Sequence, residues 1–178
     1  MSEDAADIRA QIASEVEQWR AEFHRLVDRI EPNAWEAPSG NAGWRVRQVV
    51  GHLAAQPDGS VRLVGVARSG KTMLKGVPHQ LLDLTSLWLV RLTSRGLTPE
   101  GARARYDAGH RRLTALLAAV GDSEFGSAGV AFGQSMTVAD AFRELGHQVD
   151  AHSAEVQVGL DIAAGAVVPL RPSQEDPA

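Results

Sequence analysis

The strongest constraint on this fold is a set of apolar stripes that repeat with the period of an α-helix. The longest stripes lie within residues 8–30 and 138–156, and shorter ones follow Trp44 and Thr98. In each, apolar side chains recur at steps of three and four residues, which gathers them on one helix face. The two long stripes consist of Ile8, Ile12, Val16, Trp19, Phe23, Leu26 and Ile30, and of Val138, Phe142, Leu145, Val149 and Val156.

Capping and breaking residues set the ends of these helices. Pro32 ends the first one. Thr98 offers a capping hydroxyl, followed by a proline at the first helical position. Thr137 and Asp140 have the spacing of a capping box at the start of the last helix. We therefore expect an all-α protein, an antiparallel four-helix bundle with long crossover connections.

The connections between the stripes are less regular. The Pro-Asp-Gly run at 57–59 ends or kinks the second helix, and the apolar stretch 81–92 is expected to be helical. Residues 122–136 are rich in glycine, with a short extended piece expected at 130–132. We expect one domain over residues 1–165. The proline-containing tail, residues 166–178, is expected to be disordered.

Charge and cysteine content exclude several classes of function. The 178-residue chain has 22 acidic and 18 basic side chains, a formal net charge of −4, which disfavours binding to nucleic acid. It has no cysteine, which excludes disulfides, thiolate ligands and a cysteine nucleophile. The acidic start is unlike a secretory signal, and no apolar run is long enough to cross a bilayer. These features predict a cytoplasmic protein with a small-molecule substrate and no membrane partner.

A phosphate-loop pattern occurs at residues 65–72, which read Gly-Val-Ala-Arg-Ser-Gly-Lys-Thr. A working phosphate loop lies between a strand of a parallel sheet and the N-terminus of a helix. Here Gly76 and Pro78 would interrupt that helix, and the chain lacks the alternation of strands and helices. We therefore reject nucleotide binding and expect a flexible basic loop.

Two of the six histidines are expected to face the interior of the bundle. His152 belongs to the apolar seam of the last helix, with Gln148 on the same flank, whereas His147 falls nearly opposite. His52 flanks the stripe of the second helix, and His110 is expected to pack, partly exposed, on the third. One ligand per helix is no metal signature, so spacing alone favours hydrogen-bonded interhelical histidines.

Three segments carry a resemblance to a known family. They are Trp-Glu-Ala-Pro-Ser at 35–39 with Gly-Trp-Arg-Val-Arg-Gln-Val-Val-Gly-His-Leu-Ala at 43–54, Met-Thr-Val-Ala-Asp at 136–140, and Asp-Ala-His-Ser-Ala-Glu-Val at 150–156. Together they resemble the DinB-like superfamily, in particular the actinobacterial members that include the N-terminal domain of mycothiol-dependent maleylpyruvate isomerase.

The resemblance implies a four-helix bundle, often a homodimer, with a divalent metal such as zinc or nickel held by the second and fourth helices. His52 and His152 match the first and last ligands. Gln148 stands where the family has His or Glu, and its neutral oxygen is a weaker ligand. Either Gln148 belongs to an altered site, or His147 replaces it through a helix distortion, or metal binding has been lost.

The function implied by the resemblance is that of a metal-dependent enzyme. It would act with a low-molecular-weight thiol such as mycothiol, as a transferase or isomerase, or it would be a hydrolase. A bound water or cofactor thiol would lose its proton near neutral pH. Basic side chains in the 58–80 loop could hold an anionic ligand, although a solvated surface is the simpler interpretation: Arg62, Arg68, Lys71 and Lys75. The alternative is a non-catalytic small-molecule-binding or sequestering protein with a degenerate metal site.

Overall fold

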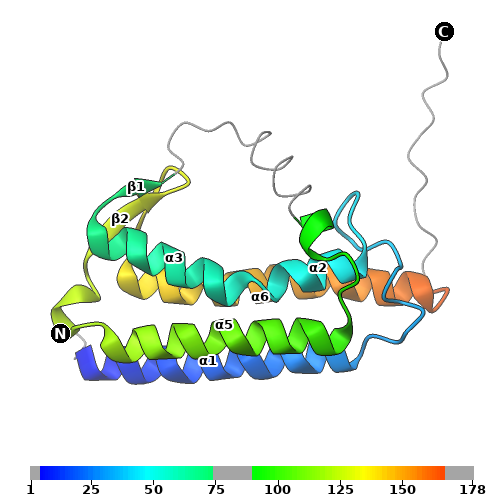
Figure 1. Cartoon of the computed structure of the whole chain (residues 1–178), viewed down its shortest axis with the longest axis horizontal. Coiled ribbons are helices and arrows are strands. Elements are labelled where there is room, and N and C mark those ends of the chain that lie inside the picture. Colours follow the sequence, from blue (N-terminus) through cyan, green and yellow to red (C-terminus); the bar gives the residue numbers. More distant parts are fainter. Residues whose placement is uncertain (1–4, 74–89, 167–178) are drawn as a thin grey trace, which may run out of the picture.

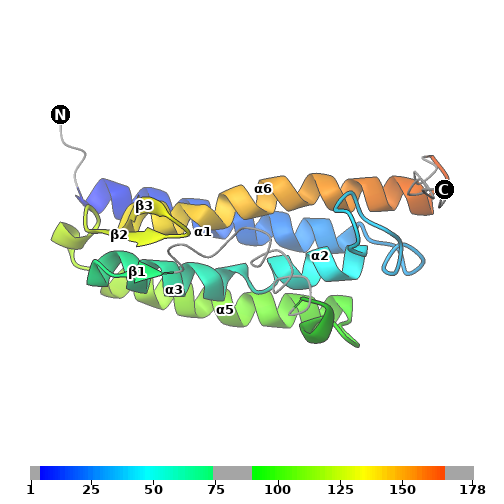
Figure 2. The same cartoon turned by 90° about the horizontal axis from the view of Figure 1, so that it is seen from above.

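The helices run side by side along the length of the molecule in two layers (Figures 1 and 2). The computed structural model describes residues 5–73 and 90–166. Helix α1 (Ala5–Asp28) and helix α5 (Pro99–Ala119) form one layer, and α2 (Val46–Leu53), α3 (Gln56–Ser69) and α6 (Val138–Ala163) form the other. Helix α6 packs on α1, α2 and α3, while α5 packs on α1 and α3. The predicted four-helix bundle is confirmed, with its second member divided into α2 and α3.

The core forms where the apolar stripes meet. Phe23 of α1 and Tyr106 of α5 are both fully buried, and their rings stack with centroids 4.2 Å apart. Thr98 caps α5 by accepting a hydrogen bond from the Gly101 amide. Thr137 and Asp140 form the predicted capping box of α6. The starts of these two helices could therefore be predicted from the sequence, because capping is a local interaction.

The second helix is kinked rather than ended near Pro57. The break falls at Ala54 and Ala55, and Pro57 lies in the first turn of α3, where a missing N–H leaves no hydrogen bond unmade. Both alanines keep the right-handed helical conformation, so the chain continues in nearly the same direction. Helix α3 thus extends α2 along the bundle (Figure 2).

The expectation of a flexible basic loop at 65–72 is wrong. Helix α3 continues to Ser69, and Gly70 ends it in the left-handed conformation, with φ of 61°. Val64 and Ala67 are fully buried, so burial of this face holds the segment helical. Gly65 lies on the exposed outer side and disturbs nothing. Here a helix precedes a strand, which is the reverse of the order in a phosphate loop.

A small three-stranded sheet adds to the expected helices at one end of the bundle. Strand β1 (Thr72–Met73) pairs in parallel with β2 (Ala128–Ala131), and β3 (Gln134–Thr137) pairs antiparallel with β2. Strand β2 confirms most of the extended piece expected at 130–132. Gly129 lets β2 approach α3, because a Cβ there would lie 2.6 Å from the Val66 carbonyl oxygen. The short helix η1 (Asp122–Glu124) links α5 to this sheet.

Some expectations fall outside the described residues. The helix expected over 81–92 is described only from residue 90 onward, where residues 90–93 are helical. The expected disordered tail is described only at residue 166. Within the described ranges, no helix combines the length and hydropathy needed to span a membrane.

Candidate metal-binding site

The candidate site lies where α2 crosses α6, at the opposite end of the bundle from the sheet (Figure 1). His52 lies in the last turn of α2, and Gln148 and His152 lie one turn apart on α6. The two helices approach closely because α6 carries Gly159 at the crossing. A Cβ on Gly159 would lie 2.3 Å from Cγ2 of Val46.

The rings of His52 and His152 meet at this crossing. Their centroids are 4.8 Å apart and their planes are nearly perpendicular, at 80°. Trp44 lies edge-on to His52 on another side, with ring centroids 5.6 Å apart. Two imidazoles from different helices therefore face one small volume, as the helical phases of the sequence predict.

A carboxylate orients the ring of His152. Nδ1 of His152 is 2.7 Å from Oε2 of Glu155, so the Nδ1–H donates to the carboxylate. The side-chain amide of Asn41 donates to both oxygens of Glu155, at 3.1 and 3.2 Å. Nε2 of His152 is thereby left as the nitrogen with a free lone pair. Metal-binding histidines commonly have this carboxylate–imidazole arrangement.

Gln148 is also held by a carboxylate. Its Nε2 donates to Oε1 of Glu144 at 2.8 Å, which fixes the orientation of the amide and leaves its oxygen free for other partners. Gln148 lies near enough to His52 to raise the pKa of that ring. The three residues singled out in the sequence are therefore neighbours in space.

The environment of His52 keeps its ring neutral. Burial, and then the nearby charge of His152, lower the pKa of His52 to about 4, while Gln148 and Glu155 act in the opposite direction. A neutral imidazole is the form that binds metal ions.

One neighbour of His52 was missed in the sequence. Nε2 of Gln56, in the first turn of α3, lies 2.6 Å from Nε2 of His52. The four-residue spacing is the signal that could have found it, but Pro57 placed a helix boundary between the two residues. Asn41, in the loop before α2, was likewise missed as the partner of Glu155.

His147 is not part of this cluster. It is exposed and lies with Trp19 and Arg143 beside a shallow cavity of about 160 Å³ on the α1 side of α6. Helix α6 is unbroken from Val138 to Ala163, so the distortion that would redirect His147 is not observed.

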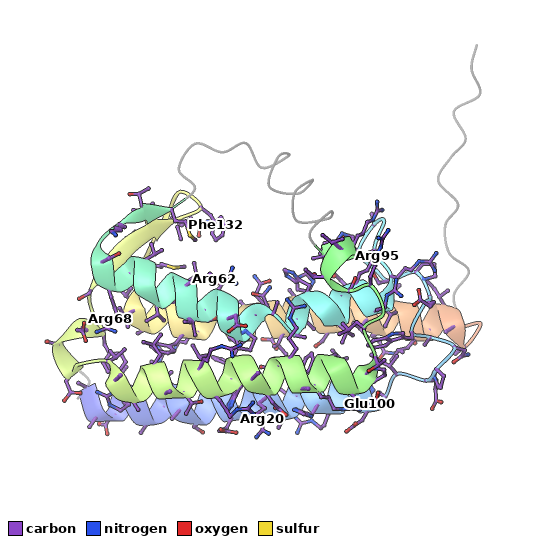
Figure 3. All side chains as sticks on the ribbon, viewed as in Figure 1. Arg20, Arg62, Arg68, Arg95, Glu100 and Phe132 are labelled. Atoms are coloured by element: carbon purple, nitrogen blue, oxygen red, sulfur yellow. The ribbon has the colours of Figure 1, made fainter. Side chains whose placement is uncertain are left out.

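His110 and the basic side chains also lie apart from the site. His110 is 5 % exposed, so the expectation of partial exposure is wrong; it lines a cavity between α1 and α5. Arg68 lies on α3 near the sheet and forms two hydrogen bonds with Glu124, while Arg62 lies midway along α3 (Figure 3). Lys75 is outside the described residues.

The residues present fit a divalent ion through imidazole nitrogens and amide oxygens. In the part of the chain that the structure describes, no three His, Cys, Asp or Glu side chains are grouped to hold a metal. The candidate donors among these residues are thus two imidazoles and a glutamine amide. Such a set matches zinc or nickel in ligand type, with less affinity than a set of three histidines.

A known family model matches most of this sequence. The family model for the mycothiol maleylpyruvate isomerase N-terminal domain matches residues 16–157. The chain belongs to this family. The mycothiol maleylpyruvate isomerase N-terminal domain family is part of the DinB/YfiT-like superfamily, as the sequence resemblance indicated.

Solved structures share the fold at low sequence identity. YfiT from Bacillus subtilis, described as a probable metal-dependent hydrolase with an unusual four-helix bundle topology, is 20% identical, with a TM-score of 0.65 over 88% of this chain and 87% of YfiT. The mycothiol-dependent maleylpyruvate isomerase is 13% identical, with a TM-score of 0.66 over 84% of this chain. The match spans 61% of the isomerase. No curated protein sequence matches the chain significantly.

Proposed function

We propose that this chain is a metal-dependent enzyme that acts on a small molecule together with a low-molecular-weight thiol such as mycothiol, as a transferase or isomerase. The ion, zinc or nickel, would be held by His52, Gln148 and His152. The observation that carries this proposal is the approach of two imidazoles from different helices to a centroid distance of 4.8 Å. The descriptions of YfiT as metal-dependent and of the isomerase as mycothiol-dependent support the choice of chemistry.

The chain's own residues would prepare the site in three ways. Glu155 accepts a hydrogen bond from the Nδ1–H of His152, which would direct Nε2 toward the ion. Glu144 holds the nitrogen of Gln148, which frees the amide oxygen for the same purpose. The Trp44 ring shields one side of His52 from water. When bound, the ion would lower the pKa of a thiol or water beside it to near neutrality.

Metal titration of the purified protein tests this proposal. We expect the metal-free protein to bind one equivalent of zinc or nickel by calorimetry. His52→Ala and His152→Ala should each reduce the affinity strongly, while His147→Ala, on the outer flank of α6, should bind as the wild type does. Absence of binding in the wild-type protein, or equal effects of all three substitutions, would overturn the proposal.

Gln148 favours a second candidate, a small-molecule-binding or sequestering protein on the same fold. The amides of Gln148 and Gln56 beside His52 provide hydrogen-bonding groups suited to a polar ligand without metal. Thermal-shift measurements distinguish the two functions. Stabilisation by metals, and by thiols only when metal is present, supports the enzyme. Stabilisation by small molecules regardless of metal supports the binding protein.

A further inference from the structure

Gln56 is placed by the break between α2 and α3. Because Ala54 and Ala55 both keep the right-handed helical conformation, Gln56 follows His52 by nearly one regular helical turn. The backbone hydrogen bonds from Ala54 N to Val50 O, and from Gly59 N to Ala55 O, carry the helical path across the break. The half-buried Gln56 side chain therefore lies on the same face of the chain as the His52 ring.

The Gln56 amide occupies the nitrogen of His52 that a metal would need. Nε2 of Gln56 lies 2.6 Å from Nε2 of His52. An amide N–H can only donate, so Nε2 of His52 accepts and the ring proton lies on Nδ1. The lone pair that receives this hydrogen bond is the one that would bind the ion. An ion at this position would repel the N–H group and attract the amide oxygen.

The amide of Gln56 has a glycine beside its oxygen. The Gln56 oxygen lies above Gly59, one turn along α3, and a Cβ on Gly59 would come within 3.3 Å of it. Because Gly59 has no Cβ, the Gln56 oxygen has no side-chain atom of residue 59 against it. A rotation about the last side-chain bond exchanges the positions of the oxygen and the nitrogen with little movement of the rest of the side chain.

From this geometry we infer that Gln56 is a further ligand of the metal, which it binds through its amide oxygen. This inference rests on the proposed function. The full set would be His52, Gln56, Gln148 and His152, two imidazole nitrogens and two amide oxygens, and a thiol or water would join them as a fifth ligand. All four bind as neutral groups, so the ion would keep its full positive charge and would favour an anionic ligand such as a thiolate.

Titration of the metal-free protein with cobalt(II), followed by visible absorption, tests this inference without any measurement of activity. We expect Gln56→Ala to weaken cobalt binding by at least about tenfold, because even residues outside the ligand sphere are commonly worth that much. The cobalt absorption band should also change in shape. Gln56→Glu should bind more tightly than Gln56→Ala, since a carboxylate replaces the amide oxygen. Gln18→Ala, which removes an exposed glutamine of α1, is the matched control and should behave as the wild type.

The possible outcomes separate this inference from the proposed function. If wild-type protein binds no cobalt, the proposed function fails, and this inference with it. If the wild type binds and Gln56→Ala binds equally well or more tightly, with an unchanged absorption band, only the role of Gln56 is overturned, and the amide is a bystander or a competitor. Far-ultraviolet circular dichroism of both Gln56 variants confirms that they are folded, and Gln56→Glu keeps the test valid if Gln56→Ala is not.

Discussion

Two regions of the bundle gather histidines and polar side chains, and they differ in how those groups are paired. Between α1 and α5 lies a cavity of about 490 Å³, lined by Glu17, Arg20, Asp107 and His110 among others. Between α2 and α6, the rings of His52 and His152 lie with centroids 4.8 Å apart. Arg20 marks the cavity's side of the bundle in Figure 3.

Opposite charges neutralise one another in the α1–α5 region. Arg20 Nε donates to Asp107 at 2.8 Å, and Nε2 of His24 lies 2.9 Å from the same carboxylate. Nε2 of His110 lies 3.2 Å from Glu17, although without the alignment of a hydrogen bond. Burial lowers the pKa of His110, which keeps this ring neutral.

In the α2–α6 region, the carboxylates form hydrogen bonds with the candidate ligands instead. Glu155 and Glu144 each accept a hydrogen bond from one side chain of the cluster, and the rings of the two histidines lie with centroids 4.8 Å apart. The candidate site is thus indicated by neutral nitrogen and oxygen donors from two helices, rather than by the size of a cavity. Substitutions in the two regions should therefore affect different properties of the protein.

The largest effect is expected in the α1–α5 region, on stability alone. Phe23→Ala removes a fully buried ring that stacks on Tyr106 and should lower the free energy of unfolding by about 3–5 kcal/mol. Urea denaturation monitored by circular dichroism measures this change. The milder Phe23→Leu should retain zinc affinity while it is folded, and a loss of affinity there would contradict the separation of the two regions.

A substitution at the carboxylate that orients His152 should change metal affinity rather than the stability of the fold. Glu155→Gln removes the negative charge behind His152 and leaves one acceptor oxygen for the two donors, His152 and Asn41, so it should weaken zinc binding about 10–100-fold, as is typical for such partners. Calorimetric titration measures the change. Glu22→Gln on α1 serves as the control. Equal zinc affinity in Glu155→Gln and the wild type would show that His152 needs no orienting carboxylate.

The crossing of α2 and α6 should be sensitive to a single methyl group. Gly159→Ala brings a Cβ into Val46 and the Pro38 carbonyl oxygen, so we expect a loss of about 1–3 kcal/mol together with weaker metal binding. The matched control is Gly65→Ala on the exposed face of α3, where a Cβ meets nothing within 4 Å. That substitution should leave stability unchanged or raise it by up to about 1 kcal/mol. Thermal unfolding of both variants gives the comparison.

The smallest effect should depend on pH. Burial raises the pKa of Asp107, but hydrogen bonds from Arg20 and His24 outweigh it and set the pKa below the usual value. A lowered folded-state pKa gives stability that is present above the unfolded pKa, about 3.9, and is lost as pH falls through the folded value. Asp107→Asn should therefore cost up to about 1 kcal/mol at pH 7 and progressively less below pH 4. A constant difference from pH 7 to pH 3, by urea denaturation, would contradict this account.

The sequence by itself determined the bundle and the main members of the candidate site. A period of 3.6 residues fixes which side chains share a helix face, so helical phase alone separates His152 and Gln148 from His147. Capping residues set the ends of α5 and α6 for the same local reason. Metal binding at this site stays a prediction.

Only the tertiary structure decided the groups that support this site. Asn41 reaches Glu155 across 114 positions of sequence, and this contact depends on how the loop before α2 packs on α6. Gln56 reaches His52 because Ala54 and Ala55 continue the helical path, a conformation that the following proline made hard to foresee. The helical state of residues 65–69 was likewise decided by the burial of Val64 and Ala67. Helix phase is a local property of the chain, whereas contacts between helices depend on the packing of all of them together.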